Sequence, residues 1–384
     1  MTGLNGCHAD VVGGGIGGLT TALALARQGA SVRVFEQARE FAEVGAGIQI
    51  TPNAMRALEA LGLRDALDER AVLSDAVVPK DGMTGRSLAR LDLRAYNPRY
   101  CFIHRAHLID LLAEACRKDG VALTLNSAVT VTVTTSNGQP VPDLLQDGPA
   151  ADLVVFADGL RSQGRAVLNG AGDPPFTGQV AWRALVQGDH PPEAHIHMLP
   201  GRHLVTYPVA DGVTNLVAVQ ERSGWAAEGW SHADDPDNLR AAFRDAGRDV
   251  RALLDRVEDV NLWGLFRHPV AAYWFKGGTA LVGDAAHPTL PFLAQGANLA
   301  IEDAYVLARC CAEDGVKRGL ARYQDMRRPR VSRAIEAANA NARNYHLGGP
   351  RRWIAHRGLN ALGLIAPGAF LNRLGWLYDH DVTA

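Results

Sequence analysis

Cysteine is scarce in this chain, and the few cysteines lack the spacing of a cross-link or a metal site. Five occur among 384 residues, and no two of them form a CxxC pattern. An odd number without that spacing argues against a disulfide framework and against zinc. We therefore expect no metal, and a reducing, cytoplasmic compartment. The adjacent pair Cys310 and Cys311 falls in a helical pattern and is expected to pack in the core.

Long apolar runs and an excess of one charge are also missing, and we expect no secretory leader. No segment reaches the roughly 20 consecutive apolar residues of a membrane-spanning helix, and the start, MTGLNGCHAD, lacks the regions of a secretory signal. The net charge is −2 and the basic residues are scattered, so we expect no nucleic-acid partner. What is present is 47% hydrophobic residues, over a length that suits two domains or one elaborated domain.

A glycine-rich turn near the N-terminus is the first positive signal. Residues 11–36 contain a short strand, the turn GGGIGG, a helix LTTALALARQG and the strand SVRVFE, which is the βαβ start of a doubly wound sheet. Gly13 allows the tight bend, Gly15 the close approach of a pyrophosphate, and Gly18 the packing of helix on strand. Glu36 ends the second strand, where a carboxylate binds an adenosine ribose and disfavours a 2′-phosphate. The unit therefore predicts NAD or FAD.

Beyond this unit the chain alternates between helical and extended patterns. Apolar spacing predicts helices over 53–68 (broken at Gly62), 104–120, 237–247 and 299–346. β-Forming residues predict a hairpin within 121–135, a buried strand in 151–159 and an antiparallel sheet between about 180 and 265. The change to mainly β-forming segments near residue 180 indicates a second domain.

The stretch LVGDAAHPTLPFLAQGANLAIEDA, residues 281–304, distinguishes between the two dinucleotides. An NAD dehydrogenase needs nothing of this kind, whereas a flavin has ribityl hydroxyls and a ring edge that becomes anionic on reduction. Asp284, at the end of a strand, suits a ribityl hydroxyl. The backbone N–H groups of Gly296, Ala297 and Asn298, at a helix N-terminus, suit the anionic edge. His287 is expected to support the loop rather than to act as a base.

Several separated motifs together resemble one known family. They are GGGIGG with FEQ at 35–37, GAGIQITPN at 45–53, HR at 104–105, ADGLRS at 157–162, TGQVAWRAL at 177–185, the GD stretch from 281, and WLYDHD at 376–381. The chain resembles, almost end to end, the class A flavoprotein aromatic hydroxylases, and within them the group of salicylate hydroxylase, 3-hydroxybenzoate 6-hydroxylase and 6-hydroxynicotinate 3-monooxygenase.

The resemblance implies further cofactor contacts. Arg105 would lie near the FAD pyrophosphate, Gln49 near the flavin, and the backbone of Val129 near the adenine. Asp158 would serve both FAD and the pyridine nucleotide. No second G-x-G-x-x-G follows a strand, as expected in a family whose NADH or NADPH has no domain of its own; NADH is favoured by analogy.

The implied reaction is hydroxylation of an aromatic ring. NAD(P)H reduces FAD, O₂ adds at flavin C4a, and the hydroperoxide attacks a ring whose hydroxyl the protein deprotonates. His203 and Tyr207, four residues apart in a strand, face the same side, and the resemblance gives them the roles of base and hydrogen-bonding partner. The alternative is a solvent-facing histidine and a packing tyrosine. Three apolar residues would form the substrate-pocket wall: Pro291, Phe292 and Leu293.

The expected fold is α/β: a Rossmann-like FAD-binding domain of the glutathione-reductase type, an inserted, mainly antiparallel β substrate domain, and a helical C-terminus. The expected boundaries are 1–75, 100–178 and 268–345 for the FAD domain, 76–99 and 179–267 for the substrate domain, and 346–384 for the C-terminal segment. The expected substrate is a small hydroxylated aromatic acid, with O₂, in a monomer or homodimer. The alternatives are a hydroxylase of a larger quinolone, quinone-precursor or polyketide, and an NAD-binding dehydrogenase.

Overall fold

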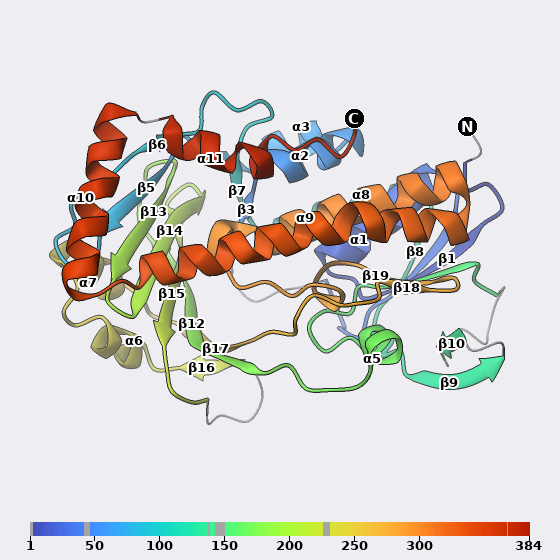
Figure 1. Ribbon diagram of the computed structural model, residues 1–384. Helices are drawn as coiled ribbons and strands as arrows, with labels where there is room; N and C mark the ends of the chain where they lie inside the picture. Colours follow the sequence, from blue (N-terminus) through green and yellow to red (C-terminus); the bar gives the residue numbers. More distant parts are fainter. Residues whose placement is uncertain (1–2, 42–46, 137–138, 143–149, 226–230, 367) are drawn as a thin grey trace.

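Two large β-sheets organise the chain, and helices fill the space around and between them (Figure 1). The computed structural model describes residues 3–41, 47–136, 139–142, 150–225, 231–366 and 368–384. The start of the GAGIQITPN motif, residues 45 and 46, lies outside the described residues. The predicted fold class, an α/β protein with a mainly antiparallel second sheet and a helical C-terminus, is confirmed.

The first sheet has six strands in the order β18-β19-β11-β1-β2-β8. All neighbours are parallel except the edge strand β18, which is antiparallel to β19. Their bounds are β1 His8–Val12, β2 Ser31–Phe35, β8 Ala122–Thr124, β11 Leu153–Phe156, β18 Phe275–Lys276 and β19 Thr279–Leu281. Four strands are buried along most of their length, as expected of a parallel sheet covered by helices.

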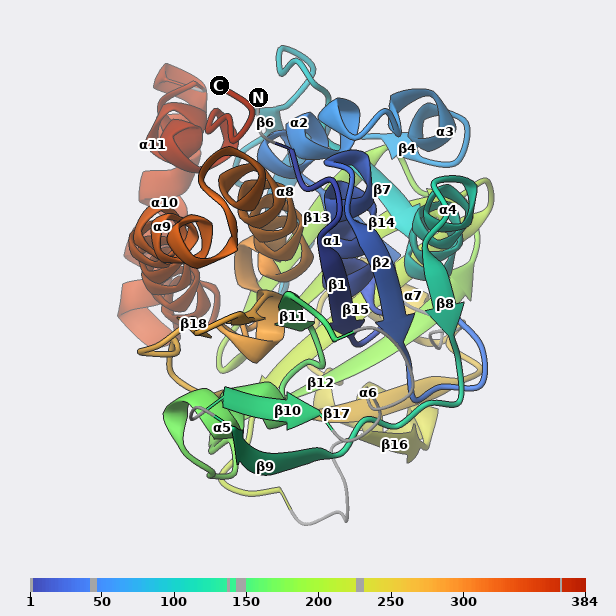
Figure 2. The ribbon, with the colours of Figure 1, turned by 90° about the vertical axis from the view of Figure 1, so that its right-hand side faces the viewer.

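Helix α1 (Ile16–Arg27) packs between α4 (Arg105–Lys118) and α8 (Gly296–Asp314) on this sheet, as Figure 2 shows end-on. Smaller elements extend the same part of the molecule. They are β3 Gly47–Ile50, α2 Pro52–Ala60, α3 Arg64–Asp68, β4 Val72–Leu73, β7 Cys101–His104, β9 Val131–Ser136, β10 Gln139–Pro142 and α5 Gln163–Asn169. Strands β3, β7 and β4 form an antiparallel sheet of their own.

The second sheet has eight strands in the order β16-β17-β12-β15-β14-β13-β5-β6 and is antiparallel except between β13 and β5. Their bounds are β5 Ala76–Asp81, β6 Leu91–Asp92, β12 Phe176–Gln187, β13 Glu193–Leu199, β14 Arg202–Ala210, β15 Val213–Glu221, β16 Ser231–Asp234 and β17 Val260–Phe266. Residues 76–92, with β5 and β6, thus belong to the second sheet, whose other strands come about a hundred residues later in the chain.

Alternation along these strands gives the second sheet two different faces. On one face Trp182, Leu204 and Leu216 pack against α6 (Pro236–Ala242) and α7 (Arg248–Leu254). On the other, Ala181 and Val219 pack against Phe292, while Tyr207 belongs to the core of the first sheet. The second face therefore looks toward the first sheet, and it is the one that carries His203 and Tyr207.

Helix α9 (Val316–Tyr345) runs beside α8 and reaches from one sheet to the other (Figure 1). Near its start it contacts β18, and just past its end Gly201 N donates to His346 O at 3.0 Å, beside β14. Helices α10 (Gly349–Ile365) and α11 (Ala369–Tyr378) complete the chain. Within the described residues no helix is both long and apolar enough to span a bilayer.

One local prediction is wrong. Residues 121–135 do not form a hairpin: β8 joins the first sheet beside β2, and β9 pairs with β10 instead. The helical prediction for residues 299–346 is confirmed, with Gly315, at φ of 75°, separating α8 from α9. The expectation for Cys310 and Cys311 is confirmed, since both are fully buried free thiols.

Candidate active site

The glycine turn joins β1 to α1, and its packing explains two of the glycines. Gly13 has φ of 103°, and a Cβ there would lie 2.5 Å from the carbonyl oxygen of Ala157. A Cβ on Gly18 would lie 1.9 Å from the oxygen of Gly13. At Gly15, the N-cap of α1, a Cβ would meet nothing within 4 Å. The first N–H groups of α1 therefore have open space beside them, which suits an anion.

Two carboxylates lie beside this turn. Glu36 accepts hydrogen bonds from Gly14 N at 2.5 Å and from Ala38 N at 2.8 Å. Asp158 accepts one from Gln163 N at 2.8 Å through Oδ2, while its buried Oδ1 has no hydrogen-bond partner among the described residues. Burial raises the pKa of Asp158. A buried carboxylate oxygen without a donor is costly, and a bound hydroxyl group would satisfy it.

Val129 lies close to the same place. Gln163 Nε2 donates to Val129 O at 2.7 Å, so this backbone carbonyl is already used within the protein. The preceding residues are held against the end of β2, since Ser127 N donates to Glu36 O at 2.8 Å. The structure thus brings Val129, Glu36 and Asp158 together around the glycine turn.

Asp284 stands in a short 3-10 turn, Gly283–Ala285, after β19. Gly283 and Ala285 are buried on either side of it, yet the Asp284 side chain is open to solvent. Burial among the surrounding atoms raises the pKa of this carboxyl, while His287, Arg105 and Arg183 act in the opposite direction. The Asp284 carboxylate is therefore accessible to a ligand although its neighbours in the chain are buried.

The turn that carries Asp284 is held from two sides. Arg165 Nη1 donates to the carbonyl oxygens of Ala285 and Ala286 at 3.2 and 3.0 Å. Asp303, on α8, accepts from Gly283 N at 3.3 Å and binds His287 Nε2. His287 is fully buried, and its role is to support the loop. These contacts fix the position of the Asp284 backbone.

The first turn of α8 forms the other end of this stretch. The side chain of Asn298 is occupied within the protein: Oδ1 accepts from Thr51 N at 2.9 Å, and Nδ2 donates to Gln49 O at 2.8 Å. Asn298 therefore ties α8 to β3 and α2, and it offers a ligand only its backbone. The N–H groups of a first helical turn lack intrahelical acceptors, so Gly296, Ala297 and Asn298 present backbone donors.

The backbone just before this helix is strained. Leu293 and Ala294 have φ of 64° and 53°, in the left-handed region that residues with a Cβ rarely adopt. Such conformations cost about 1–3 kcal/mol each and persist where surrounding contacts impose them, often at ligand sites. Phe292 is buried, and Pro291 and Leu293 are half-buried.

Gln49 and Tyr207 meet on the inner side of this loop. Tyr100 Oη donates to Gln49 Oε1 at 2.5 Å, and the Tyr207 ring stacks on Phe102 with centroids 5.0 Å apart. Burial raises the pKa of Tyr207 well above its usual range, against the opposing influences of Arg183, Gln49 and Arg105. Tyr207 is therefore neutral and able to donate a hydrogen bond.

Arg105 and Arg183 place positive charge in the same region. Arg105 begins α4, and Arg183 lies on the inner face of β12 with its guanidinium 5.1 Å from the Trp263 ring centroid. Both oppose the rise that burial causes in the pKa values of Asp284 and of Tyr207, which puts the four side chains within electrostatic reach of one another. Sequence reasoning did not single out Arg183, although the motif TGQVAWRAL contains it.

His203 is buried, with 1% of its surface exposed. Its ring centroid lies 5.2 Å from that of Phe292 and 5.3 Å from that of Tyr345. Burial lowers the pKa of His203 well below its usual range, and His346 lowers it further. The imidazole is therefore neutral at neutral pH and can accept a proton. The solvent-facing alternative is excluded by this burial.

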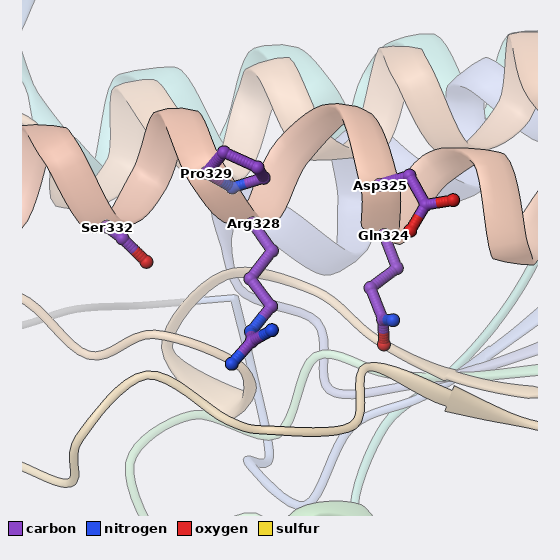
Figure 3. A pocket seen from close by; sticks show the side chains of 5 residues that line it. All are labelled: Gln324, Asp325, Arg328, Pro329 and Ser332. Carbon is purple, nitrogen blue, oxygen red and sulfur yellow. The ribbon is translucent and has the colours of Figure 1, made fainter.

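A separate surface hollow of ≈ 340 Å³ lies along α9 (Figure 3). Its lining is Gln324, Asp325, Arg328, Pro329 and Ser332, which includes none of the predicted site residues. Gln324 points from α9 toward the loops beneath it and accepts a hydrogen bond from Trp274 N at 2.8 Å. The Trp274 ring in turn stacks on His287. This part of α9 supports the Asp284 loop from outside.

The arrangement fits FAD on three structural grounds. The open space at Gly15 fits a pyrophosphate, the unsatisfied Oδ1 of Asp158 fits a hydroxyl donor, and the exposed Asp284 carboxylate fits a second hydroxyl group. No cluster of histidine, cysteine, aspartate and glutamate that could hold a metal occurs among the described residues.

The fold and this site define a nucleotide-binding flavoprotein, and comparisons with known proteins identify the family. Residues 7–338 match the FAD binding domain family. The chain belongs to this family and, as its motifs predict, to the class A flavoprotein aromatic hydroxylases. The predictions of an FAD cofactor and of aromatic-ring monooxygenase activity are confirmed at this level.

Individual relatives align over nearly the whole chain. A 3-amino-4-hydroxybenzoate 2-monooxygenase of Streptomyces platensis is 36% identical over 391 residues, covering 97% of this chain and 96% of the relative. The 3-hydroxybenzoate 6-hydroxylase 1 of Aquipseudomonas alcaligenes is 32% identical, covering 97% and 98%. A salicylate hydroxylase in a substrate complex has the same fold, with a TM-score of 0.79 at 24% identity, covering 98% and 96%.

We expect Asp284→Ala to weaken FAD binding. Loss of a hydrogen bond to a charged group costs about 1.5–3 kcal/mol, or roughly ten- to hundredfold in Kd. Fluorescence titration of the apoprotein with FAD measures this. The matched control is Asp211→Ala, an exposed aspartate in the turn between β14 and β15. Thermal unfolding of the apoprotein should not show a loss, because the variant removes a carboxylate that burial disfavours. Unchanged FAD affinity would contradict the ribityl assignment.

Proposed function

We propose that this enzyme uses NAD(P)H and O₂ to hydroxylate the ring of a small hydroxylated aromatic acid. The observation that carries the proposal is the buried, neutral His203 on the sheet face that looks toward the FAD part of the protein. A phenol becomes a much better nucleophile when it loses its proton, and a neutral imidazole accepts that proton. The relatives that act on aminohydroxybenzoate and hydroxybenzoate, aligned over 97% of the chain, support the same substrate class.

The side chains around His203 divide the work of binding the substrate. His203 takes the proton of the ring hydroxyl, and Tyr207 donates a hydrogen bond to the substrate. Arg183, on the same sheet face, supplies the positive charge that a carboxylate needs. Phe292, with Pro291 and Leu293, forms an apolar wall that excludes water from the reacting ring.

The same geometry supports a proposed set of FAD contacts. Gly13, Gly15 and Gly18 with the start of α1 would hold the pyrophosphate, near Arg105. Glu36, Val129, Asp158, Asp284 and Gln49 would bind the adenosine, ribityl and flavin parts, and the α8 start at Gly296, Ala297 and Asn298 the ring edge. When bound, FAD supplies the hydride acceptor and the site of oxygen activation.

The proposed domains follow the two sheets. The FAD domain is 1–75, 100–178 and 268–345, the substrate domain is 76–99 and 179–267, and 346–384 is the C-terminal segment. The pairing of β5 with β13 supports the transfer of residues 76–99 to the substrate domain. All five cysteines are free thiols, which supports a reducing, cytoplasmic compartment. NADH as reductant and a monomer or homodimer stay predictions.

A substrate panel tests the proposal directly. NADH and NADPH oxidation is measured with 3-amino-4-hydroxybenzoate, 3-hydroxybenzoate, salicylate, 6-hydroxynicotinate and a quinolone, and products are identified by mass. Each acid is paired with the same phenol lacking its carboxylate. We expect product from at least one acid and a higher KM for its partner, because Arg183 then has no anion to bind. Product from the quinolone alone would favour a larger substrate. Stimulated oxidation that yields only peroxide with every compound would refute the proposal.

A further inference from the structure

Three hydrogen-bonded side chains connect the buried His203 with the protein surface. His203 Nδ1 lies 2.8 Å from His346 Nε2, and His346 Nδ1 lies 2.8 Å from Glu221 Oε1. The exposed fraction rises along this series, from 1% for His203 and 8% for His346 to 56% for the Glu221 side chain. The two rings and the carboxylate therefore form a continuous path from the candidate site to water.

The path is assembled from three separate elements. His203 lies on β14, Glu221 ends β15, and His346 caps the C-terminus of α9. Two backbone hydrogen bonds hold them in place: Gly201 N donates to His346 O at 3.0 Å, and Glu221 N donates to Gly201 O at 2.9 Å. Because one turn residue binds both partners, the end of α9 cannot shift without breaking this arrangement.

Glu221 opens onto a surface hollow of ≈ 400 Å³. Its other lining residues are Thr177, Gly178, Gln179, Arg222 and Ser223. The far end of the path is thus accessible to solvent through a polar recess, and a proton on Glu221 can be exchanged with bulk water.

The chemistry of the carboxylate determines the tautomers of both rings. Ionised Glu221 only accepts hydrogen bonds, so His346 Nδ1 must carry the proton between them. In a neutral imidazole the other nitrogen is then an acceptor, so His203 Nδ1 donates to His346 Nε2. The remaining nitrogen of His203, Nε2, consequently bears a lone pair. With these tautomers, His203 Nε2, at the buried end of the path, is able to act as a base.

We propose that His203, His346 and Glu221 form a proton relay that carries the proton of the substrate hydroxyl from the active site to the solvent. The proposal rests on the proposed function and deepens it. His346 and Glu221 are positioning residues in this scheme, because they act on the substrate only through His203.

The transfers balance. The substrate O–H bond breaks, and its proton bonds to His203 Nε2 while the ring oxygen keeps the electron pair. The Nδ1 proton of His203 moves to His346 Nε2, and the Nδ1 proton of His346 moves to the Glu221 carboxylate, which releases it to water. After hydroxylation the same steps in reverse return one proton to the product oxygen, and each ring regains its first tautomer.

The surroundings of the two rings oppose a lasting positive charge on either of them, so a proton that His203 takes up is passed on. Phe292 and Tyr345 pack on His203. Burial raises the pKa of the Tyr345 hydroxyl to about 12, so both neighbours are uncharged. Burial lowers the pKa of His346, while Glu221 acts in the opposite direction. Both imidazoles are therefore neutral at rest, and the positive charge that enters at His203 is attracted toward the carboxylate.

The test uses variants that keep the hydrogen bonds but do not relay protons. His346→Gln retains an acceptor for His203 and a donor for Glu221, and Glu221→Gln retains an acceptor for His346. The FAD-loaded proteins are mixed without oxygen with 3-amino-4-hydroxybenzoate and with 3-hydroxybenzoate, and phenolate formation is followed by near-ultraviolet absorbance. We expect each variant to slow phenolate formation about tenfold or more, within the range of general acid–base effects, with FAD content and substrate Kd unchanged.

Two comparisons distinguish a proton relay from a purely structural role of His346 and Glu221. The double variant should be no slower than either single variant, because a path once broken is not broken further, whereas independent structural defects add. His356→Gln is the matched control: this buried histidine also contacts a carboxylate, Asp81, at 3.3 Å, but lies on α10 outside the path. It should react at the wild-type rate.

The outcomes distinguish this proposal from the proposed function. If the wild type converts none of the four aromatic acids of the substrate panel to a hydroxylated product, the proposed function fails and the relay falls with it. If the wild type makes product and His346→Gln forms phenolate equally fast, or if the two single losses multiply in the double variant, the relay alone is overturned. A loss in His346→Gln and Glu221→Gln that the double variant does not deepen supports it.

Discussion

Replacing Arg327 by methionine is expected to lower the free energy of unfolding by about 3–5 kcal/mol, because it removes the one cation that both buried carboxylates share. Arg327 lies inside α9 with 1% of its side chain exposed. Its Nε binds Asp303 Oδ1 at 2.7 Å, and its Nη1 binds Glu302 Oε2 at 2.5 Å. Both carboxylates are fully buried.

The pKa shifts of these carboxylates give the effect a pH signature. Burial alone would raise the pKa of Glu302, but Arg327 and Arg330 outweigh it and lower the pKa from 4.5 to about 2. Burial likewise opposes ionisation of Asp303, yet His287 and Arg327 lower its pKa. A folded-state pKa below the unfolded value contributes stability above the unfolded pKa, and this contribution is lost as pH falls through the folded pKa.

The deficit of Arg327→Met should therefore be largest near pH 7 and should shrink as the pH falls through 4.5 toward 2. Denaturant unfolding of wild type and variant at several pH values measures it. The control is Arg322→Met on the same helix, whose pairs with Glu313 and Asp314 are exposed, so that its loss should stay below about 1 kcal/mol. Equal losses at both positions would contradict the account. FAD should also dissociate more readily from Arg327→Met, because Asp303 holds the Asp284 turn.

Local patterns in the sequence predicted the features that neighbouring residues determine. The glycine turn, Glu36 and the start of α8 each lie within about 25 residues of continuous chain, and their geometry follows from strand, turn and helix rules. The hairpin prediction at 121–135 is wrong because β-forming residues indicate a strand but not the strand with which it pairs. β8 pairs with β2, about 90 residues earlier in the chain.

The contacts that sequence reasoning missed all join distant segments. His346 is 143 residues from His203 and 125 from Glu221. Arg165 reaches the Asp284 turn from 120 residues away. Such partners depend on how the two sheets and α9 are packed, and a single sequence carries no signal for that packing.

The assignment of His203 as the base makes the second large prediction. His203→Ala should lower the rate of ring hydroxylation by about 10²- to 10⁴-fold, the usual contribution of general acid–base catalysis. FAD binding should persist, because none of the described contacts of His203 involves the glycine turn, Asp284 or the start of α8. Turnover is measured as hydroxylated product, and FAD content from visible absorbance.

Since His203 packs against Phe292 and Tyr345, alanine also opens a cavity, and His203→Gln serves as a second variant that keeps a hydrogen bond to His346. The decisive comparison varies the substrate. Fluorine or nitro substituents lower the pKa of the ring hydroxyl, and a substrate that is already ionised needs no base. The ratio of wild-type to variant rates should therefore fall toward one along such a series for both variants. A purely structural defect would slow the reaction of every substrate by the same factor. That result would show that His203 packs in the core but does not act as the base.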